Sequence, residues 1–368
     1  MTALTPSIPP DPDDVATPGS VSRLYEDEFV IVELVEGERA ADTIAVTFDP
    51  IMVDFSQPPY AGEFLRKAGV DLLCVRKKSE HFYQPFPRER FDEVARPVLA
   101  RYRRRLAYGS SLGAYAVLHY CQHGFDTVIA SSPRVSAHPR FGFGFWQQRV
   151  TFEHADFDPQ QPASSGAVIF YDPHDGMDRR FVEVGIRPSW PNARIVRVPY
   201  AGHPANQFLS EIGFIAPFVR AIIAGTEPPP LERRHLKTLS ASYRRVLAEA
   251  CLQHRKPLWA EQLCLDALRM TPGLLFGKRA LGQALLAQGR LDEAEPLLRE
   301  FALRYPQDGV GAAALKSLSL RRSEQARGMR ALAPVVRSVR RVNSKVRRIA
   351  AHWRRRIVSL TERVLRGR

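Results

Sequence analysis

A Gly-x-Ser-x-Gly motif is the segment of this chain whose residue types are best suited to chemistry. It occupies residues 109–113, between a predicted strand, Arg105–Tyr108, and a predicted helix, Leu112–Gln122. Small residues two before and two after a serine let the backbone bend sharply, and the first amides of the following helix face a developing oxyanion. Ser111 occupies the centre of this turn and Ser110 does not. The motif therefore predicts Ser111 as a nucleophile.

A nucleophilic serine needs a base, and the base needs an acid that fixes its tautomer. His203 follows the last predicted strand and is the only one of the ten histidines so placed. Three carboxylates, Asp172, Asp175 and Asp178, follow the strand before it, at the edge where parallel sheets build their sites. Asp172 precedes a proline and is expected to shape an Asx turn. Asp175 and Asp178 remain as candidates for the acid.

In motif, order and spacing, residues 28–224 resemble the α/β-hydrolase superfamily. The resemblance implies a serine mechanism on ester or amide substrates, with Ser111 as the nucleophile and His203, in a Gly-His turn, as the base. The family's common Gly-x-x-Asp spacing points to Asp175 as the acid. An Asp-Pro-x-x-x-x-Asp pattern associated with bacterial relatives points to Asp178, which we prefer.

The resemblance also implies an oxyanion hole with two backbone donors. One is the amide of Leu112, and the second comes from the loop after the predicted strand Thr43–Phe48. That loop lacks the family's usual His-Gly, and Pro50 has no N–H to donate. The second donor is therefore expected from Asp49, Ile51 or Met52.

Aromatic residues spaced by glycines occur between Ser132 and Ala163, where relatives insert lids. Phe141, Phe143 and Trp146 belong to this group. Such rings line an acyl or sugar pocket or fill a core, and the sequence favours neither function over the other. We name these three as candidates for the substrate pocket.

Apolar strand-like runs alternate with helical patterns along the chain, which predicts a mostly parallel sheet of α/β-hydrolase type. We expect a disordered segment at 1–24, the hydrolase domain at 25–224 and a Pro-rich linker at 225–231. The predicted strands are Phe29–Val35, Thr43–Phe48, Val70–Val75, Arg105–Tyr108, Thr127–Ser131, Ala167–Tyr171 and Arg194–Val198. The predicted helices are Tyr60–Lys67, Leu112–Gln122, Arg179–Gly185 and Ala205–Ile223.

A 34-residue repeat follows the linker. Shifting the sequence by this length places Ala260 on Ala294 and Pro272 on Pro306. This period is typical of the tetratricopeptide repeat, in which two helices cross at small residues. Residues 232–320 are therefore predicted to form an all-α helical-repeat segment that binds a protein or peptide partner.

The net charge of +14 lies entirely in a tail at 321–368, which contains sixteen basic residues and two acids. Apolar residues recur there at spacings of three and four, which predicts a basic amphipathic helix. We expect this helix to bind anionic membranes, and packing on the repeats or a coiled-coil dimer are the alternatives. The tail's charge permits binding of nucleic acid, but its apolar stripe and the absence of an RNA-binding motif make this partner less favoured.

No run of 18 apolar residues and no signal-peptide pattern occurs, so the sequence favours a cytoplasmic location, which would be peripheral at the inner membrane surface if the tail binds the membrane. No metal-type spacing or nucleotide motif is found, and we expect neither metal nor cofactor. The predicted function is hydrolysis or transfer of an acyl group on a small-molecule or glycan ester through an acyl-enzyme. The alternative is a catalytically impaired hydrolase fold that recruits partners through its repeats and tail.

Overall fold

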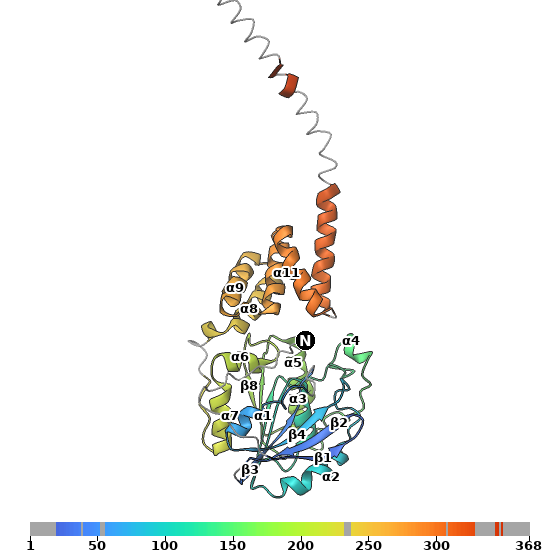
Figure 1. The fold of residues 1–368 in the computed structure, drawn as a ribbon, viewed down its shortest axis with the longest axis vertical. Helices are drawn as coiled ribbons and strands as arrows, with labels where there is room; N and C mark the ends of the chain where they lie inside the picture. Colours follow the sequence, from blue (N-terminus) through green and yellow to red (C-terminus); the bar gives the residue numbers. More distant parts are fainter. Residues whose placement is uncertain are drawn as a thin grey trace, which may run out of the picture. The chain divides into compact units, whose positions relative to one another are not determined.

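The computed structural model describes residues 20–37, 40–51, 56–231, 237–306, 308–327, 343–345, 347 and 348. In these ranges eight strands form one sheet with the order β1-β2-β4-β3-β5-β6-β7-β8 (Figure 1). β1 and β2 run antiparallel at one edge, and the strands from β4 to β8 run parallel. This is the strand order of an α/β-hydrolase. The strands are β1 (Val21–Glu26), β2 (Val30–Val35), β3 (Thr43–Phe48), β4 (Asp71–Lys77), β5 (Arg104–Ser110), β6 (Thr127–Ser131), β7 (Ala167–Tyr171) and β8 (Ala193–Arg197).

The seven strands predicted from apolar runs are all present, and the structure adds one. β1 begins at Val21, inside the segment 1–24 that we expected to be disordered. Its residues are exposed or half-buried, and Arg23 pairs with Glu26 and Glu33 on the surface. A solvated edge strand of this kind shows no apolar alternation, so its sequence carries no strand signal.

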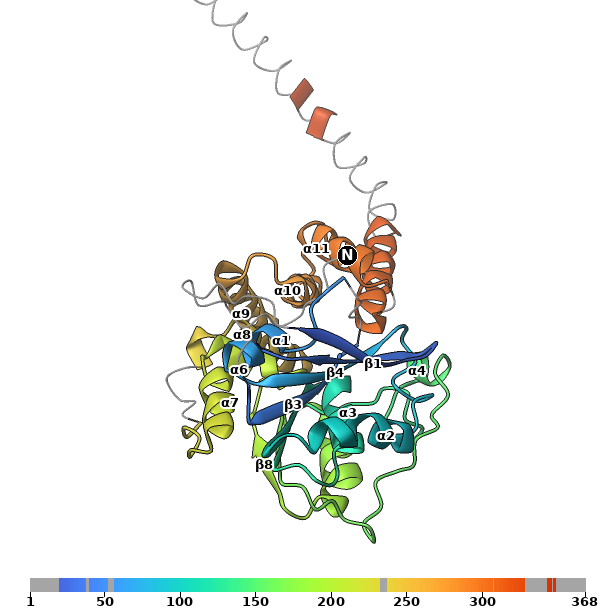
Figure 2. The same cartoon turned by 60° about the horizontal axis from the view of Figure 1, so that its bottom comes forward.

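Helices cover both faces of the sheet, and each face has its own core (Figure 2). α2 and α3 pack with Phe48 and Val75 on one face, whereas α1, α6 and α7 pack with Leu72 and Phe170 on the other. Strand residues alternate between the two cores because side chains of a strand point to opposite faces. The helices are α1 (Gly62–Lys67), α2 (Arg88–Leu99), α3 (Leu112–Tyr120), α4 (Gly144–Gln147), α5 (Gly176–Arg180), α6 (Ala205–Glu211) and α7 (Ile215–Ala224), with a π-helix at Phe181–Ile186 and a 3₁₀ turn at Arg187–Ser189.

α6 and α7 replace the single helix predicted over Ala205–Ile223. The break falls at Gly213, whose φ is +70°, and the two helices meet at 94°. Within the described ranges, no single helix is long and apolar enough to cross a membrane; only this bent pair passes that test, by its combined length and composition.

The C-terminal helices repeat with the predicted period. Ala241 and Leu275 begin equivalent helices, as do Pro257 and Leu291, and each pair is 34 residues apart. Gly289 ends one turn with φ +80°, and its counterpart Arg255 adopts φ +55° although it is not glycine. The helices are α8 (Ala241–Gln253), α9 (Pro257–Met270), α10 (Leu275–Ala287) and α11 (Leu291–Arg304), preceded by a 3₁₀ turn at Lys237–Leu239 and followed by a helix over 309–327.

The chain forms two compact units. The first unit contains the sheet and α8 as far as Cys251, together with Leu263–Gly273. The second contains Leu252–Gln262 and the residues from Leu274 onward. In the second unit α10 and α11 cross closely at Gly282, where a Cβ would lie 2.8 Å from Leu298. The predicted amphipathic helix of the tail lies almost wholly outside the described residues.

The position of α3 against the sheet depends on Gly113. A Cβ at this residue would lie 2.3 Å from the carbonyl oxygen of Phe48, at the end of β3. The obstacle is backbone, which cannot rotate away as a side chain can. Only glycine allows α3 to begin this close to β3.

We therefore expect Gly113→Ala to lower the free energy of unfolding by about 2 kcal/mol or more. Helix propensity alone predicts the opposite sign, because alanine is the better helix former. Gly144→Ala is the matched control, since a Cβ there meets nothing within 4 Å. Urea unfolding of both variants checks this. Equal stability of the two would contradict the close approach.

Candidate active site

Ser111 lies in a strained turn between β5 and α3. Its φ of +54° and ψ of −117° are unusual for a residue with a side chain. The turn is closed by hydrogen bonds: Ser111 N–H donates to the Ser131 carbonyl at 2.9 Å, and the Ser111 carbonyl accepts from the amides of Tyr115 and Arg134. At Gly109 a Cβ would lie 2.3 Å from the carbonyl oxygen of Gly113, so the turn requires glycine there as well.

The turn brings Ser111 to His203, 92 residues further along the chain. Ser111 Oγ lies 2.8 Å from His203 Nε2. His203 Nδ1 lies 3.1 and 3.0 Å from the two carboxylate oxygens of Asp178. Serine, imidazole and carboxylate are thus joined in a chain of hydrogen bonds, the arrangement required for proton transfer from a serine hydroxyl.

Asp178 and Asp175, the two candidate acids, occupy different environments. The Asp178 side chain is fully buried and contacts His203. The Asp175 side chain is 23% exposed and caps α5, where it accepts from the amides of Met177 and Asp178. The structure therefore places Asp178, and not Asp175, beside the imidazole.

Arg134 is a site residue that the sequence analysis missed. Its Nε donates to Asp178 at 2.8 Å, and its Nη2 lies 2.6 Å from oxygens of both Asp175 and Asp178. Burial by itself raises the pKa of Asp178, but the charges of His203 and Arg134 and their hydrogen bonds outweigh it and leave the pKa lowered. Arg134 comes three residues after the end of β6, and this position alone does not indicate contact with Asp175 or Asp178.

Asp172 joins the loop after β7 to the loop that carries His203. Its Oδ1 accepts from the amides of His174, in the predicted Asx turn, and of Tyr200, and its Oδ2 accepts from Gly202 N–H. Burial raises the pKa of Asp172, against the opposing effect of these three amides. Since Gly202 precedes His203, this buried carboxylate holds the backbone that positions the imidazole.

α8 covers the same loop from outside, within the unit that contains the sheet. At Gly202, with φ +73°, a Cβ would lie 2.6 Å from Val246. Glu211, in α6, accepts hydrogen bonds from Ser240 Oγ and from the N–H and Oγ of Ser242. The first helix of the predicted repeat therefore packs against the loop that contains His203.

The candidate donors to the oxyanion hole differ in whether they line the pocket at Ser111. Leu112 is the first residue of α3, so its N–H has no acceptor within the helix, and it lines the pocket at Ser111 together with Ile51. Asp49 N–H instead donates to the Val75 carbonyl, and the Asp49 carboxylate forms a buried ion pair with Arg76. Met52 lies outside the described residues.

The pocket at Ser111 has a volume of ≈ 180 Å³. It contains two of the three aromatic candidates, Phe143 and Trp146, and adds Phe82. Phe141 does not reach it and lines a second pocket. The remaining lining residues are Ile51, Leu112, Arg134, Ser136 and His203. In the part of the chain that is described, no three His, Cys, Asp or Glu side chains are grouped so that they could hold a metal ion.

Comparisons with known proteins find similarity in structure alone. No family model and no curated protein matches this chain. Carboxyl esterase 2 of the fungus Tuber melanosporum is 16% identical over 52% of this chain and 78% of its own, with a TM-score of 0.31. The peroxisomal α/β-hydrolase Lpx1 of Saccharomyces cerevisiae is 8% identical over 64% of this chain and 96% of its own, with a TM-score of 0.35. The TPR domain of Arabidopsis OM64 is 20% identical over 31% of this chain and 82% of its own, with a TM-score of 0.20.

The chain's own strand order and the turn at Ser111 define an α/β-hydrolase-type domain. The 34-residue spacing of its last four named helices defines tetratricopeptide-like repeats.

The lowered pKa of Asp178 predicts a pH dependence of stability. Because the folded state favours the ionised carboxylate, its contribution is complete above the ordinary aspartate pKa of about 4 and is lost as the pH falls through the lower, folded value. We expect the free energy of unfolding of the wild type to fall more steeply below about pH 4 than that of Asp178→Asn. Urea unfolding of the wild type and of Asp178→Asn at a series of pH values checks this. The same pH dependence of the unfolding free energy in both proteins would contradict the ion pair.

Proposed function

We propose that this protein is a serine hydrolase or acyltransferase that cleaves an ester or amide through an acyl-enzyme on Ser111. One observation carries the proposal: Ser111 Oγ lies 2.8 Å from His203 Nε2, while His203 Nδ1 contacts the buried carboxylate of Asp178. A structural histidine in a turn has no need of both contacts. The same geometry favours this function over an impaired scaffold.

His203 acts first as the base. Its Nδ1–H donates to Asp178, which leaves the Nε2 lone pair to take the proton of Ser111 Oγ–H. Oγ then attacks the substrate carbonyl, and the amides of Leu112 and Ile51 are the proposed donors to the oxyanion. The imidazolium gives its proton to the leaving alcohol or amine as the bond to it breaks. Water, or an acceptor alcohol, repeats these steps in reverse and frees Ser111.

Arg134 is a positioning residue in this scheme. Its two donors hold the Asp178 carboxylate, so the acid cannot rotate away from His203 Nδ1. The pocket sets the substrate class, because ≈ 180 Å³ beside Phe82, Phe143 and Trp146 suits a short or aromatic acyl group. The helical repeats are proposed to bind a protein or peptide partner, as stacked helix pairs commonly do.

Ser111→Ala is expected to lower the hydrolysis of short p-nitrophenyl esters by about 10⁴-fold or more, because no other group can form the acyl-enzyme. Ser110→Ala is the matched control, one residue away and buried in β5, and should retain most of the activity. Steady-state kinetics of the two variants, with unfolding curves to verify the fold, tests the proposal. Equal activity of Ser111→Ala and the wild type would refute it.

Asp178→Asn is expected to lower kcat by about 10⁴-fold, since an amide favours the wrong imidazole tautomer. Asp175→Asn leaves the contact of Asp178 with His203 in place and keeps a capping oxygen for α5, but it removes the ion pair with Arg134. It should lower kcat by less than about tenfold. Steady-state kinetics of both variants on the same p-nitrophenyl esters makes the comparison. A larger loss of kcat in Asp175→Asn than in Asp178→Asn would reverse the assignment of the acid.

A further inference from the structure

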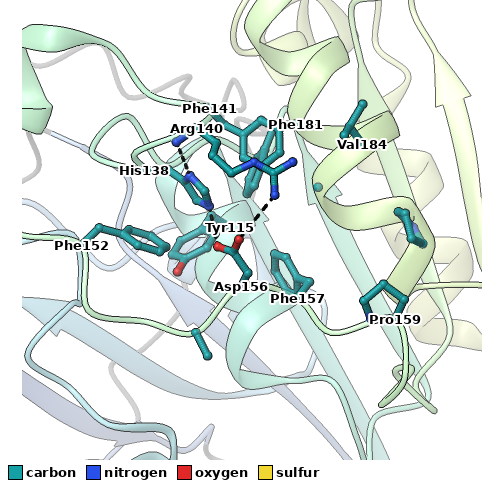
Figure 3. Close-up of a pocket in the computed structure, with 13 residues that line it drawn as sticks. Tyr115, His138, Arg140, Phe141, Phe152, Asp156, Phe157, Pro159, Phe181 and Val184 are labelled. Atoms are coloured by element: carbon teal, nitrogen blue, oxygen red, sulfur yellow. Dashed lines mark hydrogen bonds and ion pairs between the residues drawn. The ribbon is translucent and has the colours of Figure 1, made fainter.

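A second pocket is lined by Phe141 (Figure 3), whereas Phe143, two residues further on, lines the pocket at Ser111. The volume of the second pocket is ≈ 160 Å³. The loop winds tightly at Gly142, where a Cβ would lie 2.1 Å from the Ser136 carbonyl oxygen. This winding sends Phe141 into the second pocket and Phe143 into the first. The proposed hydrolysis uses no residue of the second pocket.

The walls of the second pocket are aromatic and fixed in place. Five Phe and Tyr rings line it, and four of them contact one another at centroid distances such as 5.1 Å for Phe141 and Phe181 and 6.3 Å for Tyr115 and Phe157. Tyr115 OH hydrogen-bonds to His154 Nδ1 at 2.8 Å, so this hydroxyl already has a buried partner. A space of this size between ring faces holds one further ring, since apolar cavities of about 150 Å³ bind benzene.

The rim of the pocket contains His138, Asp156 and Arg140 (Figure 3). His138 Nε2 lies 2.8 Å from Asp156 Oδ1, and His138 Nδ1 accepts from Arg140 N–H at 3.0 Å. Both ring nitrogens are therefore occupied, and burial lowers the pKa of His138. Because Nδ1 accepts a hydrogen bond, the proton of the ring is on Nε2, which donates it to Asp156.

The rim carries one arginine, Arg140, and one carboxylate, Asp156. The guanidinium of Arg140 lies 5.2 Å from the centroid of Phe141, and that of Arg180 lies 5.6 Å from the same ring. Arg140 is 61% exposed, and its Nη1 is 3.8 Å from Asp156 Oδ2, beyond hydrogen-bond distance. Arg180 lies near Phe141 but does not line the pocket, so the guanidinium of Arg140 is the positive group at the rim.

We propose that this pocket binds a small aromatic carboxylate, with its ring among Phe141, Phe157 and Phe181 and its carboxylate against Arg140. The apolar walls supply burial of the ring, and the exposed guanidinium supplies a charge-assisted hydrogen bond. Binding is independent of the chemistry at Ser111.

Titration calorimetry of the full chain carrying Ser111→Ala tests the proposal without turnover, with phenylacetate as the probe and phenylacetamide as its neutral isostere. Phenylacetate should bind about tenfold more tightly than phenylacetamide. Arg140→Gln should remove this difference by weakening phenylacetate alone. Ala155→Phe, which introduces a ring at the pocket lining, should abolish binding of both. Phe143→Leu, in the pocket at Ser111, is the control and should leave both affinities unchanged.

Absence of phenylacetate binding would overturn the proposal. Equal affinities for the two probes would overturn the assignment of an anion. Binding that survives Ala155→Phe but is lost in Phe143→Leu would place the ligand at Ser111 and overturn the second site, whether or not Ser111 proves to be a nucleophile.

Discussion

The close approach of α3 to the end of β3 is the contact on which the rest of the site depends. With Gly113 against the Phe48 carbonyl, the chain must turn from β5 into α3 within very few residues. Ser111 accepts the strained φ of that turn. The same contact places the first amide of α3 beside the loop that follows Phe48, so the nucleophile and the proposed oxyanion donors come from one packing constraint.

His203 depends on a second constraint, which lies further along the chain. Its loop is held from inside by Asp172 and from outside by Val246 of α8. Glu211 hydrogen-bonds to the start of α8. It is the last residue of α6, the helix that begins two residues after His203. A helix that the repeat pattern assigns to a docking segment is thus part of the support of the base.

The sequence predicted the sheet and the candidate site to different extents. Buried parallel strands are continuous apolar runs, so seven strands were found, whereas the solvated β1 was not. The order of Ser111, Asp178 and His203 could be deduced because each follows a strand. Arg134 could not, because its role comes from meeting Asp175 and Asp178 in three dimensions. Phe141 and Phe143 look equivalent in sequence, and only the winding at Gly142 sends them to different pockets.

Reaction of the folded protein with a fluorophosphonate tests the central claim most directly, because this probe reports an activated serine without knowledge of the substrate. Intact-protein mass spectrometry and peptide mapping should show one adduct, on Ser111, that is lost in His203→Ala. An adduct on Ser110, or none on a folded protein, would contradict the account.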